Sequence, residues 1–234
     1  MAFYINLTKH PERAAGMGLS MSIGGSTPPT PTVKGVHIWT AASGETVDTF
    51  GDNSNIIPAG YYSGRTDILK VVVDYGVYTS EGNFDGCTNL SSVTLNGRNI
   101  IRARCFRGCT SLSEVNIGNS YTRLEGWVFS GCTSLTSITL PENILLVGGW
   151  AFANCSNLEE VEFLREGSYQ LNDGAFAGCI SLDKITTHSE LAPILNGNTV
   201  FSNVGSDGTV YAPTGGDYSV FMANLPANWT IVYT

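Results

Sequence analysis

The sequence of 234 residues is poor in basic side chains and has no long apolar run. Its 12 lysine and arginine residues stand against 20 aspartate and glutamate residues, which gives a formal net charge of −8. Binding to nucleic acid depends on a basic surface, so this balance argues against a nucleic-acid partner. No apolar stretch approaches the length of a membrane helix, and we expect no membrane partner either.

Recognised catalytic and cofactor motifs are also missing. His10, His37 and His188 have no serine, cysteine or carboxylate partner at a motif spacing. The chain contains no Walker loop and no dinucleotide fingerprint. The stretch GDNSN at 51–55 lacks the spaced carboxylates of a calcium loop, so we interpret it as a turn. The sequence therefore predicts a protein without catalytic residues, cofactor or metal.

What the sequence does contain is an internal repeat. The phrase FSGCTSLTSITLP, which begins at Phe129, returns in four other clear copies, and weaker copies begin at Tyr62 and Phe201. The leading aromatic residues are 22 to 25 residues apart. Those of the clear copies are Phe84, Phe106, Phe129, Phe152 and Phe176. A fixed period in this range predicts a solenoid, in which each unit buries its apolar face on its neighbours.

Each repeat ends in a pattern typical of a short strand. Leu135, Ile138 and Leu140 alternate with polar residues, and β-branched residues are frequent. One strand per repeat, stacked in register, predicts a parallel sheet. An apolar residue lies five positions before the aromatic in four of the clear copies and predicts a second buried anchor opposite the strand. These residues are Ile101, Leu124, Val147 and Leu171.

The pattern I-x-x-x-A-F-x-G-C-x-S-L-x-x-V-x-L-P resembles the BspA-type leucine-rich repeat. The segments LVGGWAFANCSNLEEVEF and TRLEGWVFSGCTSLTSITLP are close matches, and the closing GTVYAPTGGDYSVFMANLPANWTIV is similar to the capping segment of such arrays. The resemblance implies a leucine-rich repeat solenoid. It also implies an adhesin or interaction module rather than a catalyst.

Five of the six cysteines occupy one repeat position, and the sixth, Cys105, precedes an aromatic. The five are Cys87, Cys109, Cys132, Cys155 and Cys179. Stacked parallel Cβ vectors about 4.8 Å apart are wider than a disulfide prefers, and zinc sites need ligands a few residues apart. The ladder predicts free, buried thiols.

The sequence as a whole predicts five parts along the chain. Residues 1–23 form an N-terminal anchoring arm that carries Phe3, Tyr4, Ile5 and Leu7, and residues 24–32 form a Pro/Gly/Thr-rich linker. A β cap at 33–60 precedes the repeats at 61–200, and a C-terminal cap follows at 201–234. An unstructured tail is the alternative for the arm, since chain termini are commonly mobile.

The position two residues before the aromatic is the strongest candidate for binding. It runs through Arg104, Trp127 and Trp150, and tryptophan and arginine are enriched at binding hot spots. Arg98, Arg102, Arg107 and Arg123 suggest a basic spot at this edge. The alternative, which large side chains on a thin solenoid often take, is that both rings fold over the coil as core cover. Outward strand positions instead form polar columns without anchor residues.

Together these patterns predict a non-enzymatic module that binds a protein or glycan on a host or bacterial surface. The N-terminal residues do not follow the order of an export signal. This leads us to expect a virion component, such as a bacteriophage fibre or decoration protein, held by the arm and able to form a homo-oligomer. A cell-surface or secreted adhesin and a purely structural spacer are the alternatives.

Overall fold

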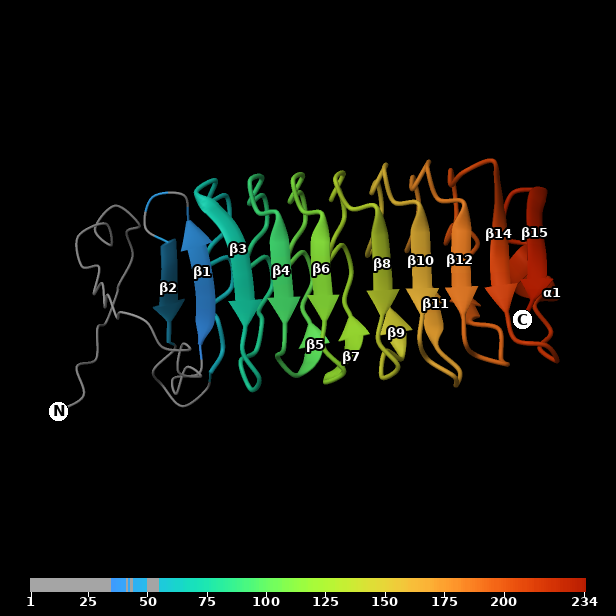
Figure 1. Ribbon diagram of the computed structural model, residues 1–234, viewed down its shortest axis with the longest axis horizontal. Helices are drawn as coiled ribbons and strands as arrows, with labels where there is room; N and C mark the ends of the chain where they lie inside the picture. The colour runs from blue at the N-terminus through green and yellow to red at the C-terminus, as the bar shows by residue number, and fades with distance from the viewer. Residues whose placement is uncertain (1–34, 41, 43, 50–54) are drawn as a thin grey trace, which may run out of the picture.

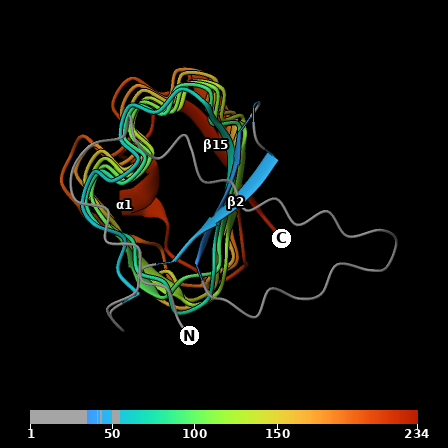
Figure 2. The same ribbon diagram turned by 90° about the vertical axis from the view of Figure 1, so that its left-hand side faces the viewer.

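The computed structural model describes residues 35–40, 42, 44–49 and 55–234. These residues wind into a parallel β-solenoid whose coils follow one another along the long axis (Figure 1). Viewed along that axis, successive coils superimpose (Figure 2). The predicted arm and linker at 1–32, with Phe3, Tyr4, Ile5 and Leu7, lie outside the described residues.

The longer strands line one side of the solenoid, as the repeat pattern predicts. They are β3 (Ile68–Val73), β4 (Ser92–Leu95), β6 (Glu114–Ile117), β8 (Ser137–Leu140), β10 (Glu160–Phe163), β12 (Lys184–Thr187), β14 (Asp207–Ala212) and β15 (Asn228–Tyr233). Equivalent residues pair in parallel, for example Val161 with Ile138 and Ile185. Apolar and polar residues alternate along each strand, as in β10. This pattern favours a strand here because the apolar residues face the core and the polar ones face outward.

The structure adds a second, short strand in five successive coils. These strands are β5 (Asn99–Ile101), β7 (Tyr121–Leu124), β9 (Leu146–Val147), β11 (Gln170–Asn172) and β13 (Ile194–Asn196), and they form their own parallel sheet. Each of the first four carries the apolar anchor predicted opposite the longer strand, and all four anchors are buried. These anchors are Ile101, Leu124, Val147 and Leu171.

The row of longer strands is interrupted between β6 and β8, which divides it into two five-stranded sheets. In neighbouring coils the residue after the strand donates its N–H to the preceding coil, as Gly118 does to Leu95 O (2.8 Å) and Leu164 to Leu140 O (3.0 Å). The equivalent residue after β8 is Pro141, which has no N–H. One cross-coil hydrogen bond is therefore impossible at the interruption.

The leading aromatic residues form a continuous stack through the core. Neighbouring centroids are 4.8 to 5.6 Å apart from Tyr62 to Phe201, and neighbouring planes differ by 14° or less. The stacked rings from Tyr62 to Phe176 are at most 1% exposed. The weaker repeats that begin at Tyr62 and Phe201 therefore stack on the clear repeats and continue the same core.

The turn after each aromatic needs a left-handed backbone. Gly108 and Gly131 have φ of 69° and 76° there, a region that glycine adopts without a Cβ penalty. Asn154 and Asn203 replace glycine at φ of 59° and 55°, and asparagine tolerates this region better than most residues. The motif F-x-G-C thus encodes a corner of the coil.

The cysteine after this corner joins two coils. Each of the five thiols donates to the carbonyl of the aromatic one repeat earlier, as Cys132 Sγ does to Phe106 O at 3.3 Å. All six cysteines are free and buried. Burial raises the pKa of Cys87 to about 11 and that of Cys155 to about 12, so these thiols stay protonated at neutral pH.

The N-terminal end carries two antiparallel strands, β1 (Val36–Thr40) and β2 (Gly44–Asp48), which extend the sheet beyond β3. His37 of β1 is buried and contacts two carboxylates, with Nδ1 2.7 Å from Glu45 Oε1 and Nε2 3.0 Å from Asp74 Oδ2. The hydroxyl of Tyr62 donates to Asp48 at 2.7 Å. Both contacts tie the cap to the first coil.

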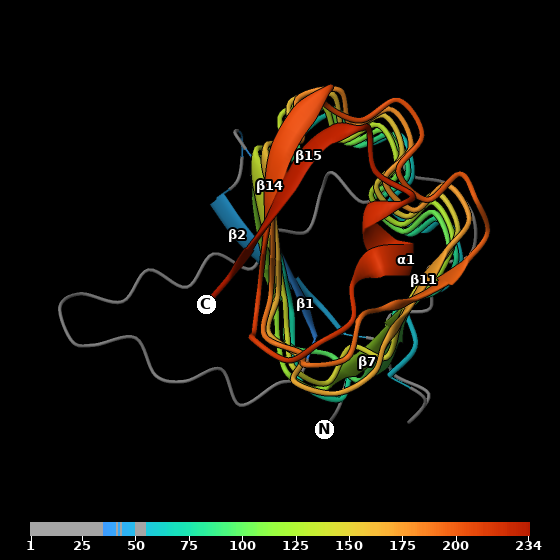
Figure 3. The same ribbon diagram turned by 90° about the vertical axis from the view of Figure 1, so that its right-hand side faces the viewer.

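The C-terminal end is closed by β15 and by the short helix α1 (Ser219–Met222), which lie nearest the viewer in Figure 3. Phe221 of α1 meets Phe201 edge-on, with centroids 5.3 Å apart and planes at 80°. The aromatic stack therefore ends in an edge-to-face contact. Trp229 of β15 is buried and donates its indole N–H to Gly205 O at 2.9 Å.

Candidate functional site

The residue two before each aromatic from Phe84 to Phe176 also has a left-handed backbone. Gly82 and Gly174 have φ of 64° and 67° at this position, where glycine is unstrained. Arg104, Trp127 and Trp150 take the same conformation, with φ of 57°, 56° and 53°. A bulky residue at positive φ is an outlier that costs about 1 to 2 kcal/mol.

These strained residues contribute little to the core. Trp127 and Trp150 are 40% and 39% exposed, and Arg104 is exposed as well. The prediction left open whether the indoles cover the coil, and their accessibility shows that much of each ring remains on the surface. Glycine occupies the same position elsewhere, so the coil does not require a large side chain here. A strained backbone conformation that the fold itself does not require is typical of functional sites.

The three side chains form one ordered row. The rings of Trp127 and Trp150 are stacked with centroids 5.3 Å apart and planes 7° apart. The guanidinium carbon of Arg104 lies over the Trp127 ring at 5.8 Å, a cation–π arrangement. We call Arg104, Trp127 and Trp150 the tryptophan ridge. The structure thus brings together the three residues predicted as the binding site.

The ridge presents ring edges rather than ring faces. Trp127 is covered on one face by Trp150 and on the other by Arg104. The pyrrole ring of Trp150 lies over Gly174, where an added Cβ would collide with it. Neither indole N–H has a hydrogen-bond partner within the part of the chain that the structure describes. The available groups are therefore C–H edges and N–H donors.

Two of the four arginines predicted as a basic spot, Arg102 and Arg107, pair with carboxylates one coil away, as does Arg104 of the ridge. Arg102 contacts Glu125 at 3.0 Å, and Arg104 contacts Glu81 at 3.2 Å. Arg107 contacts Asp85 at 2.6 Å. These pairs are separated by 22 or 23 residues, a spacing that matches the repeat and could have indicated them from the sequence. Carboxylates therefore offset the charge of Arg102, Arg104 and Arg107, whereas Arg98 and Arg123 have no ion pair among the described residues.

The outward face of the longer strands is polar, as the sequence predicts. Lys184 pairs with Glu160 at 2.7 Å, and His188 approaches Glu162 at 3.1 Å. Thr139 also bonds Glu162 at 3.3 Å. These contacts run along the sheet from coil to coil. From β4 to β12, this face lacks a cluster of large apolar side chains that could anchor a partner.

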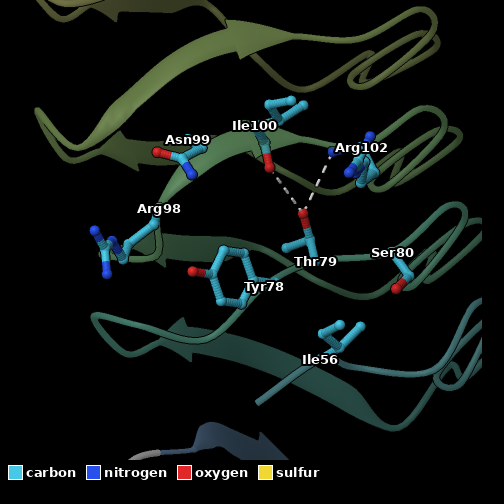
Figure 4. Close-up of a pocket in the computed structure, with 8 residues that line it drawn as sticks. All are labelled: Ile56, Tyr78, Thr79, Ser80, Arg98, Asn99, Ile100 and Arg102. Atoms are coloured by element: carbon cyan, nitrogen blue, oxygen red, sulfur yellow. Dashed lines mark hydrogen bonds between the residues drawn. The ribbon is translucent and has the colours of Figure 1, made fainter. Parts of the chain in front are cut away.

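A cavity of about 310 Å³ lies beside β5, where the sheet of shorter strands ends (Figure 4). Thr79 bridges this edge, because its hydroxyl lies 3.4 Å from Ile100 O and accepts the N–H of Arg102 at 3.3 Å. Arg98 on the rim lies over the Tyr75 ring at 5.3 Å. Thr79 and Arg98 are therefore engaged with the protein itself.

The described histidines do not form a catalytic arrangement. His37 is held between Glu45 and Asp74, a contact that sequence spacing did not reveal because Asp74 is 37 residues away. Burial lowers its pKa, while hydrogen bonds and charges from Glu45 and Asp74 raise it, and the net pKa is raised. Among the described residues no cluster of three metal-ligating side chains occurs, and no helix could span a membrane.

The coils, their paired parallel sheets and their buried aromatic stack define a solenoid of the leucine-rich repeat class. A model of the BspA type leucine rich repeat region matches residues 78–206 in six copies. Since this match covers more than half of the sequence, the chain belongs to the BspA-type leucine-rich repeat family. Solenoids of this family are typically non-enzymatic interaction modules and are generally surface-associated.

One solved structure supports the same fold, and a second is a weaker match. A leucine-rich repeat protein from Bacteroides ovatus is 22% identical, with a TM-score of 0.54, over 76% of this chain and 41% of that chain. This chain thus spans less than half the length of that relative. A leucine-rich repeat protein from T. pallidum is 18% identical, with a TM-score of 0.40, over 76% of this chain and 99% of that chain. None of the curated proteins matches the chain.

Proposed function

We propose that this chain is a non-enzymatic surface module that binds a protein partner through the tryptophan ridge. The observation that carries the proposal is the strained backbone of Arg104, Trp127 and Trp150 at a position where glycine serves equally well. The fold does not account for these side chains. Two stacked indoles and an arginine are the residue types that dominate binding energy at interfaces.

The geometry favours a protein over a glycan as the partner. A sugar ring binds tryptophan by lying on an open ring face, and the faces of Trp127 are covered by Trp150 and Arg104. Ring edges and free N–H donors fit carbonyl oxygens, carboxylates and aromatic faces, which a protein surface provides. Because carboxylates offset the charge of Arg102, Arg104 and Arg107, the ridge does not demand a strongly acidic partner.

The setting of the module stays a prediction. Display on a bacteriophage particle and display as a bacterial adhesin differ in how residues 1–32 are used, and those residues lie outside the described part of the chain. The generally surface-associated character of the family is compatible with either setting. A purely structural spacer would have no use for a strained, exposed ridge.

The test uses an array of purified cell-surface and extracellular proteins together with a glycan array. The wild-type chain is compared with the double variant Trp127→Gly/Trp150→Gly, which places glycine where the backbone already suits it. A control variant, Thr139→Ala/Thr186→Ala, alters the outward sheet face instead. We expect the wild type and the control to bind the same proteins, and the glycine variant to lose that binding at least tenfold.

Three results would contradict the proposal. Binding confined to glycans would replace the protein partner with a carbohydrate. Protein binding lost in the sheet-face control but retained in the glycine variant would move the site to the strands. Absence of binding to every probe on both arrays would favour the structural spacer.

A further inference from the structure

The last strand, β15, has an unpaired edge within the described chain. It pairs in parallel with β14 and is the terminal strand of its sheet (Figure 3). Thr234 donates its N–H to Ala212 O of β14 at 2.8 Å. Backbone groups alternate in direction along a strand, so Ile231 and Tyr233 point their N–H and C=O groups away from β14.

This edge lacks the features by which proteins usually protect edge strands. Such strands commonly carry charges, proline or bulges that prevent pairing with another chain. No charged residue occurs anywhere between Tyr218 and Thr234, and β15 itself reads NWTIVY. The strand at the opposite end, β2, carries Glu45 and Asp48. The edge strands at the two ends of the solenoid are therefore chemically different.

We propose that the β15 edge is a self-association site, at which a second copy of this chain adds its own β15 in antiparallel orientation. A two-fold contact places the same patch on both copies, so the patch must be compatible with itself. An uncharged end meets this condition even though each chain carries a net charge of −8. Val220 of α1, at the same end, is 70% exposed and adds apolar surface.

The backbone fixes the register of this contact. Centring the two-fold axis on Ile231 lets the N–H of each Ile231 donate to Ile231 O of the other copy, and each Tyr233 N–H donate to Trp229 O. The N–H of Trp229 is already bonded to Pro226 O at 3.0 Å and takes no part. On the outer face, Thr230 then lies directly opposite Val232 of the second copy.

The first experiment measures the mass of the 234-residue chain by light scattering and sedimentation over a range of concentrations. We expect a dimer in the wild type and a monomer in Tyr233→Pro. Proline removes an N–H that points away from β14, so the pairing with β14 is kept. Tyr233→Ala is the matched control, because it shortens the same side chain but retains the N–H, and it should stay dimeric.

A second experiment tests the register independently of the proline variant. In Thr230→Cys/Val232→Cys, opposed residues of the two copies lie at a Cα separation of about 4.5 Å, within disulfide range. Oxidation should therefore produce a covalent dimer, whereas Val232→Cys alone should remain monomeric on a non-reducing gel. The six native cysteines are buried and should not interfere.

The proposal is overturned if the wild type is monomeric at every concentration. It is also overturned if Tyr233→Pro melts like the wild type and still dimerises, because the contact would then lie elsewhere, for instance in residues 1–32. If Tyr233→Pro fails to fold, the cross-linking experiment with Thr230→Cys/Val232→Cys is the deciding test. If that double variant does not form a covalent dimer, both the register and the proposed site are rejected.

Discussion

Two aromatic stacks run along this solenoid, one inside and one outside. The phenylalanines are buried and have centroids about as far apart as those of Trp127 and Trp150, for example 5.4 Å between Phe106 and Phe129 against 5.3 Å between the indoles. Both stacks arise because equivalent residues of successive coils lie above one another. The phenylalanines fill the core, whereas Trp127 is 40% exposed on a strained backbone.

The difference shows that regular spacing does not by itself indicate a role in folding. Every coil from Phe84 to Phe201 supplies an aromatic ring to the inner stack, so each coil needs one. The position two residues before the phenylalanine is occupied by glycine, arginine or tryptophan between Gly82 and Gly174, and its backbone conformation does not change. The inner stack belongs to the fold, and the outer stack is available for recognition.

The largest expected effect is on the inner stack. Phe129→Ala removes a fully buried ring between Phe106 and Phe152 and should lower the free energy of unfolding by about 3 to 5 kcal/mol. Chemical denaturation followed by circular dichroism measures this loss. A loss below that of the cysteine variant described next would mean that neighbouring coils relax to fill the space, and the contrast between the stacks would weaken.

A smaller effect should follow from removing one thiol that links two coils. Cys132→Ala deletes the donor to Phe106 O and some buried volume, and should cost about 1 to 2 kcal/mol in the free energy of unfolding. Cys132→Ser retains a donor at the same place and serves as the control. Equal losses in both variants would indicate that volume, and not the hydrogen bond, determines the stability.

The contribution of His37, in the cap beside the first coil, to the free energy of unfolding should depend on pH. The pKa of His37 is raised in the folded protein, so its contribution to stability is complete below its unfolded pKa of about 6.5 and disappears as the pH rises through the folded value. We expect the difference in unfolding free energy between the wild type and His37→Gln to shrink with rising pH. A difference that is constant across the titration would mean that the His37 contacts do not depend on its charge.

The smallest effect on stability is expected for the outer stack. Trp127→Gly loses the ring contacts and the partly buried area of the indole but relieves a positive φ that costs about 1 to 2 kcal/mol, and these terms are opposite in sign. The melting temperature should therefore stay near that of the wild type. Thermal unfolding checks this directly, and a loss as large as that of Phe129→Ala would assign the ridge to the fold.

Much of the fold could be predicted from the repeated phrase, because one environment recurs in every coil. The buried anchors, the free thiols and the stacking of the weaker copies all follow from that phrase. The second strand of a coil is harder to predict, since β9 has two residues, Leu146 and Val147, too few for a periodic signal.

The candidate site was predicted by composition and position, but not its geometry. The spacing places Trp127 above Trp150, whereas arginine and tryptophan do not indicate a left-handed backbone, and only the glycines at the same repeat position, Gly82 and Gly174, hint at it. The contact of His37 with Asp74 brings together residues far apart in the sequence, outside any local motif. Such contacts depend on how the cap docks on the first coil.

The left-handed position in the coils from Phe84 to Phe176 has a consequence for how this protein can change over evolutionary time. Gly82, Arg104, Trp127, Trp150 and Gly174 share one backbone conformation, and all of them except Gly174, which is buried beneath the Trp150 ring, lie at least partly on the surface. A mutation at one of these four surface positions leaves the buried rings and the cross-coil hydrogen bonds in place. The chain can therefore acquire a new specificity one coil at a time, while selection on folding acts on a separate set of residues.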